Sequence, residues 1–129
     1  MSSLQGKTAL VTGSGRGLGK VMAERLADQG ANIVLHDISW DAPEKYKEAQ
    51  NLGEVAKEFE KKGVEVLAVT GNIGDVQAVA AMCSKIEEKF SKVDILVNCA
   101  GGDIGASGGK PSPNNALDIP IEDVQALIN

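Results

Sequence analysis

The chain of 129 residues has a mass of 13.4 kDa, the size of one ordinary domain with a single hydrophobic core. Its residues are 43% hydrophobic and 24% charged, a balance that fits a soluble globular protein and excludes the disordered and fibrous classes. The formal net charge of -5 has the wrong sign for a nonspecific nucleic-acid binder or for a protein of anionic membrane surfaces. We therefore expect a small molecule or a protein as partner, and neither nucleic acid nor membrane.

Targeting signals and cysteine chemistry are not apparent in the sequence. It contains no run of about 18 apolar residues that could span a bilayer, and its start, Met1 to Lys7, lacks the apolar segment of a secretory signal. Cys83 and Cys99 do not form a CxxC pair, and His36 is the only histidine. We expect a cytoplasmic protein with two small buried thiols and neither a disulfide nor a bound metal.

Apolar runs and helical patterns alternate along the first hundred residues. Buried strands are predicted by short β-branched and aliphatic runs at residues 7–12, 32–37, 64–70 and 93–97. Helices are predicted between them by apolar residues at helical spacing: Leu18, Val21, Met22, Leu26 and Ala27 up to Gly30; Leu52, Val55, Ala56 and Phe59 up to Gly63; and Val76, Val79, Ala80, Cys83, Ile86 and Phe90 behind an N-cap at Asp75.

This alternation predicts an α/β fold with a Rossmann-like, doubly wound parallel sheet in strand order 3-2-1-4. The connection over residues 38–51 is longer than the usual 2–6 residues or so, and part of it could extend the following helix at its start, with Pro43 in the first turn. Its Trp40 and Tyr46 could contact an adenine or a neighbouring subunit, and the sequence leaves both alternatives open.

The last part of the chain differs in composition from the rest. Residues 101–120 are rich in Gly, Pro, Ser and Asn without any period, which predicts a mobile loop. A last helix is expected to begin near Ile121, and its apolar pattern is still running at Asn129 with no cap signal. We therefore expect residues 1–129 to be a portion of a single domain that is cut within this helix.

A glycine-rich turn, Thr12-Gly13-Ser14-Gly15-Arg16-Gly17-Leu18-Gly19, leads from the first strand directly into a helix. Gly13 permits a tight turn, Gly17 lets the backbone approach a pyrophosphate, and Gly19 lets the helix pack close to the strand. The helix N-terminus adds free N–H groups and partial positive charge. A purely structural turn would also use glycines, but the strand before it and the helix after it favour a phosphate-binding loop.

Charged residues near this loop indicate which nicotinamide dinucleotide, NAD or NADP, the loop would bind. Asp37 ends the second strand near the offset of about 20 residues at which an acid accepts the ribose hydroxyls of an adenosine. Its carboxylate would repel a 2′-phosphate and so favours NAD over NADP. Arg16 could instead attract a phosphate, pair with Asp37 or face solvent. His36 has no evident nucleophile as a partner, so we expect a packed or surface histidine rather than a base.

These residues resemble the short-chain dehydrogenases/reductases, and the resemblance covers the entire chain. The family's TGxxxGxG motif is matched by Thr12, Gly13, Gly17 and Gly19, and its NNAG motif appears as Asn98-Cys99-Ala100-Gly101. Where the family carries an Asp and an aliphatic residue near the adenine, this chain has Asn72-Ile73, and Asp94 resembles the family's acid in the fourth strand. Together the motifs and the resemblance imply a cofactor site of Gly13, Ser14, Arg16, Gly17, Leu18, Gly19, Asp37, Asn72, Ile73, Asn98, Ala100 and Gly101.

The resemblance also implies which catalytic residues are missing. The family's hydride-transfer chemistry depends on a YxxxK tyrosine and lysine, an upstream serine and an asparagine in the helix after the long loop. The only tyrosine is Tyr46, with Gln50 where the lysine would stand, and the last helix stops about two residues before the asparagine would come. We therefore assign no catalytic residue, Asn129 included, and expect this chain alone to bind a dinucleotide without catalysing.

Two functions follow from these observations. The first is the N-terminal cofactor-binding part of an NAD(P)(H)-dependent oxidoreductase that interconverts a small-molecule alcohol and a carbonyl, partnered by the C-terminal remainder of the same protein. The resemblance also implies a homo-oligomer, a dimer or a tetramer. The alternative is a catalytically inactive dinucleotide-binding or interaction module complete at 129 residues. A methyltransferase-like nucleoside binder shares the loop and the acid but is disfavoured by the motif at residues 98–101.

Overall fold

The computed structural model of the protein describes residues 3–101, 117–118 and 120–128. Four parallel strands, β1 (Thr8–Val11), β2 (Asn32–Asp37), β3 (Val66–Thr70) and β4 (Ile95–Val97), form one sheet in the order β3-β2-β1-β4. This order and the Rossmann-like α/β class are those predicted from the alternation. β2 spans the predicted residues, and the other strands are shorter by one or two residues at their ends.

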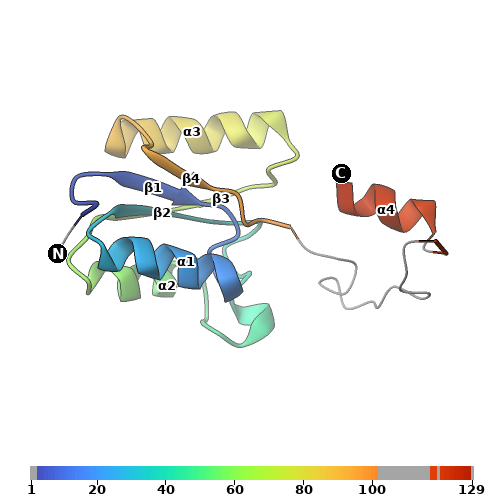
Figure 1. The fold of residues 1–129 in the computed structure, drawn as a ribbon, viewed down its shortest axis with the longest axis horizontal. Helices are drawn as coiled ribbons and strands as arrows, with labels where there is room; N and C mark the ends of the chain where they lie inside the picture. The colour runs from blue at the N-terminus through green and yellow to red at the C-terminus, as the bar shows by residue number, and fades with distance from the viewer. Residues whose placement is uncertain (1–2, 102–116, 119, 129) are drawn as a thin grey trace.

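Helices cover both faces of the sheet. Figure 1 shows α1 (Gly17–Asp28) and α2 (Leu52–Glu60) on one face and α3 (Val76–Phe90) on the other. α4 (Ile121–Ile128) begins at the predicted residue, whereas most of the loop expected over 101–120 lies outside the described residues. Within the described ranges, no helix has the length and hydrophobicity needed to cross a bilayer.

The core has two parts because successive side chains of a strand point to opposite faces. Ile33 and Leu35 of β2 belong to a cluster shared with α1 and α2, while Val34 packs with residues of β3 and α3. Since both faces are covered, the middle of β2, Ile33 to Leu35, is a continuous apolar run, which explains why this strand could be recognised from sequence.

The buried face of α1 differs from the prediction. It consists of the small residues Gly19, Ala23 and Ala27, whereas Leu18, Val21 and Met22 are 72%, 53% and 40% exposed. The prediction of these three as core residues was wrong because α1 approaches the sheet too closely for large side chains. A Cβ atom on Gly19 would overlap the carbonyl oxygen of Gly13.

The buried face of α3 was predicted correctly only in part. Met82 and Ile86 are buried, with Val79 and Phe90 packed against the same cluster, but Val76, Ala80 and Cys83 of the predicted face are exposed. Met82 and Cys83 lie three and four residues after Val79, and both spacings fit one face of a helix. In the structure Met82 is buried and Cys83 is exposed. The Asp75 N-cap is confirmed, since its carboxylate accepts from the N–H groups of Gln77 and Ala78.

The connection after β2 does not extend α2. It contains a separate 3₁₀ helix, η1 (Glu44–Tyr46), which Lys47 ends with a left-handed φ of 57°. α2 starts independently at Asn51, whose side-chain oxygen accepts from the N–H of Glu54. The predicted extension of α2 was therefore wrong, because the backbone turns at Lys47 and is extended at Asn51.

Candidate functional site

The residues singled out from the sequence gather where the strands end. The carboxyl ends of the strands, the start of α1 and the connection that contains η1 lie at the same end of the sheet (Figure 1). In open α/β sheets, ligands bind in the crevice outside the carboxyl ends of the strands.

Three predicted glycines serve three purposes in this loop. Gly13 has a φ of 65°, and a Cβ atom there would lie 2.9 Å from Cα of Ala100. Gly19 gives α1 its close approach to the loop. Gly17 has a φ of 57°, and a Cβ atom there would meet nothing within 4 Å, so the start of α1 borders open space.

Thr12 joins the glycine loop to the turn after β4. Its hydroxyl oxygen accepts from the N–H groups of Cys99 and Ala100, each at 3.0 Å, and its hydroxyl lies 3.4 Å from the carbonyl oxygen of Val97, to which it donates. Thr12 belongs to the sequence motif but was not predicted as a site residue. Because the Cys99 contact uses its backbone, cysteine in place of the family's asparagine leaves this link intact.

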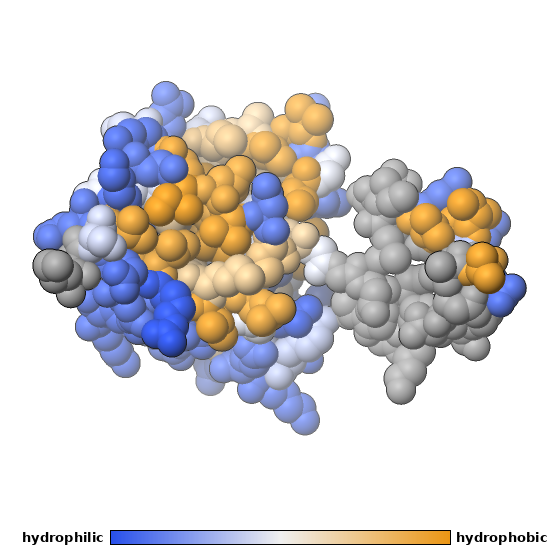
Figure 2. All heavy atoms as spheres, in the orientation of Figure 1, coloured by the Kyte–Doolittle hydropathy of each residue, from blue (hydrophilic) through white to orange (hydrophobic). Residues whose placement is uncertain are grey.

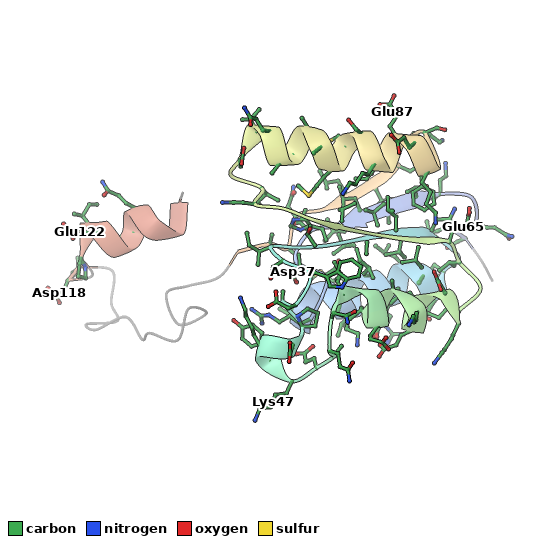
Figure 3. The ribbon with its side chains drawn as sticks, turned by 180° about the vertical axis from the view of Figure 1, so that it is seen from behind. Asp37, Lys47, Glu65, Glu87, Asp118 and Glu122 are labelled. Atoms are coloured by element: carbon green, nitrogen blue, oxygen red, sulfur yellow. The ribbon has the colours of Figure 1, made fainter. Side chains whose placement is uncertain are left out.

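Asp37 reaches from the end of β2 to the glycine loop. Its Oδ2 accepts from the Gly15 N–H at 3.1 Å, and its Oδ1 accepts from the N–H of Ile38 at 2.9 Å. A Cβ atom on Gly15 would lie 2.6 Å from Oδ2, so a side chain there would displace the carboxylate. Gly15 was missed because the family motif leaves its position variable. Figure 3 shows Asp37 beside η1, with Lys47 pointing away from it.

His36 is buried, at 3% exposure, and links the loop to β3. Its Nδ1 lies 3.1 Å from the Gly13 nitrogen, and its Nε2 lies 2.8 Å from the Gly71 carbonyl oxygen. Because the Gly13 N–H can only donate, Nδ1 accepts and Nε2 carries the hydrogen. Ser14, also buried, accepts from the His36 N–H through its hydroxyl. Of the two environments expected for this histidine, packed or surface, the structure shows the packed one, and its link between the loop and β3 is additional.

The turn after β3 lies next to Asp37. The Gly71 N–H donates to the Asp37 carbonyl oxygen at 3.1 Å, and Asn72 and Ile73 follow, both exposed. The Asn72 side-chain oxygen accepts from the N–H of Gly74 at 2.9 Å. Asn72, which stands where the family carries its Asp near the adenine, therefore also shapes the turn into α3.

The connection after β2 contributes two contacts that sequence reasoning did not place. The Arg16 guanidinium lies over the Tyr46 ring, 3.3 Å from its centroid. Oε2 of Glu48 accepts from the Gly17 N–H at 3.1 Å. Tyr46 was noted for its aromatic ring, but no local pattern identified Glu48.

Asp94 belongs to the opposite end of the sheet and not to this site. Its carboxylate accepts from the Thr8 N–H at 2.9 Å and lies 3.0 Å from the Lys92 ammonium. The Thr8 hydrogen bond, followed by that to Lys92, holds the pKa of Asp94 below its ordinary value. In the described part of the chain, no three His, Cys, Asp or Glu side chains are grouped to hold a metal ion.

Known proteins are similar to this chain in sequence and in fold. A family model described as short chain dehydrogenase matches residues 7–129. Diacetyl reductase of Staphylococcus epidermidis is 40% identical over 123 residues, which cover 95% of this chain and 41% of that protein. The 7alpha-hydroxysteroid dehydrogenase of Escherichia coli is 36% identical over 120 residues, 93% of this chain and 40% of its own length.

Solved structures agree with this result. The crystal structure of NAD⁺-bound xylitol dehydrogenase matches with a TM-score of 0.74 at 29% sequence identity. The aligned part covers 98% of this chain and 42% of the xylitol dehydrogenase chain. The chain therefore spans about two fifths of the length of the proteins it matches. Fold, motifs and sequence similarity agree that the chain belongs to the short-chain dehydrogenase family, whose members bind nicotinamide dinucleotides.

Proposed function

We propose that the chain is the dinucleotide-binding part of an oxidoreductase that interconverts an alcohol and a carbonyl with NAD(H). One observation carries the proposal: the glycine loop, Asp37 and residues 98–101 meet at one end of the sheet, joined by the Thr12 and Asp37 hydrogen bonds. The start of α1, at the Gly17 N–H that the exposed Glu48 carboxylate contacts in this structure, is the proposed place of a phosphate. The bound nicotinamide would give or take the hydride.

Each part of the site has a proposed ligand. The start of α1 holds the pyrophosphate, Asp37 the adenosine ribose, the turn after β3 the adenine, and the turn after β4 the nicotinamide end. The set of residues is the one expected from the sequence: Gly13, Ser14, Arg16, Gly17, Leu18, Gly19, Asp37, Asn72, Ile73, Asn98, Ala100 and Gly101. Ser14 acts through His36, since its buried hydroxyl bonds to the β2 backbone.

Charge at the ribose end supports NAD over NADP. A 2′-phosphate beside Asp37 would meet a carboxylate already held toward the loop by the Gly15 N–H. Arg16, the residue that could attract that phosphate, stacks on Tyr46.

Cofactor preference is tested by titrating the purified protein with NADH and with NADPH and following nicotinamide fluorescence. We expect NADH to bind about tenfold more tightly or better, from the charge repulsion at Asp37. Asp37→Asn keeps an oxygen acceptor for the Gly15 N–H but removes the negative charge, so it should lower the ratio of the NADPH Kd to the NADH Kd. Asp28→Asn, in a surface pair with Lys62, is the matched control and should leave the ratio unchanged. Equal or tighter binding of NADPH by the wild type would contradict the proposal.

An apolar surface supports a larger protein around this part. Figure 2 shows hydrophobic residues gathered between α3 and α1, over the side of the sheet that ends in β4. Val21 of α1 and Leu96 of β4 are 53% and 56% exposed. Because an apolar edge strand invites aggregation, we infer that further polypeptide, the C-terminal remainder of the same protein, covers it. Substrate and oligomer contacts would then lie mainly in that remainder.

Catalysis is assigned to the same remainder. Tyr46 lies at the proposed adenosine end with its ring against Arg16, whereas residues 98–101 are proposed to hold the nicotinamide end. Gln50 stands at the lysine position of a YxxxK motif that would begin at Tyr46. A denaturing intact-mass spectrum of the purified protein tests this assignment. We expect polypeptide beyond 13.4 kDa that contains a YxxxK motif, and turnover of NAD⁺ with alcohols only in its presence. A single soluble, monodisperse 13.4 kDa species would instead favour an inactive binding module.

A further inference from the structure

The connection over residues 38–51, here called the strap, is anchored at both ends and folds back onto the glycine loop. Ala42 and Pro43 are buried, and the Trp40 carbonyl oxygen accepts from the Leu52 N–H at 2.8 Å. The Trp40 ring also lies close to Gly53, where a Cβ atom would be 2.7 Å from it. The strap is therefore a packed part of the molecule, which holds its central residues at a defined place.

The centre of the strap faces the start of α1. η1 presents the Tyr46 ring to Arg16, and the left-handed turn at Lys47 reverses the chain so that Glu48 reaches the Gly17 N–H. α1 has no side-chain hydrogen bond at its N-cap, Arg16, and no acidic residue in its first turn. Glu48 thus supplies, from outside the helix, the negative charge that a helix N-terminus favours.

Resting on the proposed function, we propose that Glu48 is an internal competitor of the cofactor's pyrophosphate. The Gly17 N–H carries one hydrogen, and a phosphate bound at the start of α1 needs the place and the positive potential that the Glu48 carboxylate uses. The incoming dinucleotide displaces this carboxylate, which is exposed and can rotate into solvent. The Arg16–Tyr46 stack keeps the strap in place meanwhile, so only the Glu48 side chain has to move. Glu48 therefore lowers the affinity for the cofactor.

The test compares ligands with and without the pyrophosphate. Calorimetry gives the Kd of ADP-ribose and of adenosine for the wild type, Glu48→Gln and Glu44→Gln. We expect Glu48→Gln to tighten ADP-ribose binding about fivefold, the size of an anion's interaction with a helix N-terminus. Adenosine binding should stay within about twofold, because adenosine carries no phosphate. Glu44→Gln removes the same charge from η1, away from the Gly17 contact, and should change neither Kd.

The outcomes separate this inference from the proposed function. If the wild type binds ADP-ribose and Glu48→Gln binds it equally or more weakly, the competitor role is overturned while the dinucleotide site stands. Equal tightening by Glu44→Gln would also overturn it, because general charge would then explain the effect. If neither the wild type nor Glu48→Gln binds ADP-ribose, the proposed function falls together with the inference. Glu48→Ala should reproduce the Glu48→Gln result, since the carboxylate is lost in both.

Discussion

Gly13, Gly17 and Gly19 lack a side chain for different physical reasons, and substitutions separate these reasons. At Gly19 a methyl group would overlap the Gly13 carbonyl oxygen, a backbone atom that cannot move without moving β1 or α1. We expect Gly19→Ala to lower the free energy of unfolding by about 3 kcal/mol, as overpacking does, and to weaken NAD⁺ binding. Urea denaturation measures the first effect and titration the second.

Gly6→Ala is the matched control for this substitution. Gly6 has a φ of 79°, and a Cβ atom there would meet nothing within 4 Å, so only backbone strain of about 1–2 kcal/mol is expected, with NAD⁺ affinity unchanged. If Gly19→Ala proved no more destabilising than Gly6→Ala, the close approach of α1 would not be the reason for Gly19.

The two hydrogen bonds of the buried His36 ring predict how its substitution changes stability. Replacing it with Phe would leave the Gly13 N–H and the Gly71 carbonyl oxygen without their buried partner. We expect His36→Phe to lower the free energy of unfolding by about 2 kcal/mol, measured by urea denaturation. His36→Gln, which keeps an acceptor and a donor, should recover part of this loss. Equal stability of wild type and His36→Phe would show that the two hydrogen bonds contribute nothing.

At the level of elements, Asp94 joins the first residues of β1 and β4. Because its pKa is lowered in the folded state, its carboxylate stabilises the fold above the ordinary pKa of about 3.9. That stabilisation is lost as the pH falls through the lowered pKa. The wild type should therefore exceed Asp94→Asn in free energy of unfolding by a constant amount above about pH 5, and the excess should shrink below about pH 4.

Urea denaturation over a pH series measures this difference. Glu87→Gln is the control, because the Glu87 side chain projects from the outer side of α3 (Figure 3). A stability difference between wild type and Asp94→Asn that stays the same from about pH 3 to pH 7 would contradict the assigned role.

β1 and β2 could be predicted because they are buried on both faces, so their local composition already reflects the tertiary environment. β3 and β4 are edge strands that are only partly buried, and their short aliphatic runs identified them. The faces of the helices could not be predicted in full, because they depend on the distance between helix and sheet. Gly19, Ala23 and Ala27 carry little hydrophobic signal yet are buried, whereas Leu18 and Val21 carry a strong one and are exposed. The period of α1 was correct, and its inward face was predicted only in part, since Leu26 and Ala27 pack on the core whereas Leu18, Val21 and Met22 do not.

The candidate site shows the same division between local and long-range information. The glycine loop, Asp37 and the turn after β4 are recognisable from sequence because their glycines and polar residues have fixed spacings. Glu48 and His36 are not, because their contacts with Gly17 and Gly13 cross more than twenty residues of sequence and need the folded chain. A local pattern could identify the length of the strap but not its contacts.

At the level of the whole molecule, the site and the apolar edge lie on one continuous sheet. The carboxyl ends of the strands bear the polar and glycine residues, while the edge strand β4 exposes Leu96 and the helix α1 exposes Val21 and Met22. The chain therefore combines the proposed dinucleotide site with an exposed apolar surface, and it spans about two fifths of the length of the relatives it matches.

The central claim is that a nicotinamide dinucleotide binds across the carboxyl ends of these strands. Hydrogen–deuterium exchange of the purified protein, followed by mass spectrometry with and without NAD⁺, tests it most directly. We expect slower exchange in peptides covering residues 13–19, 37–38, 72–73 and 98–101, with no change at Gly30 or residues 61–64 at the opposite end of the strands. Unchanged exchange in the first set, or slowing confined to the second, would contradict it.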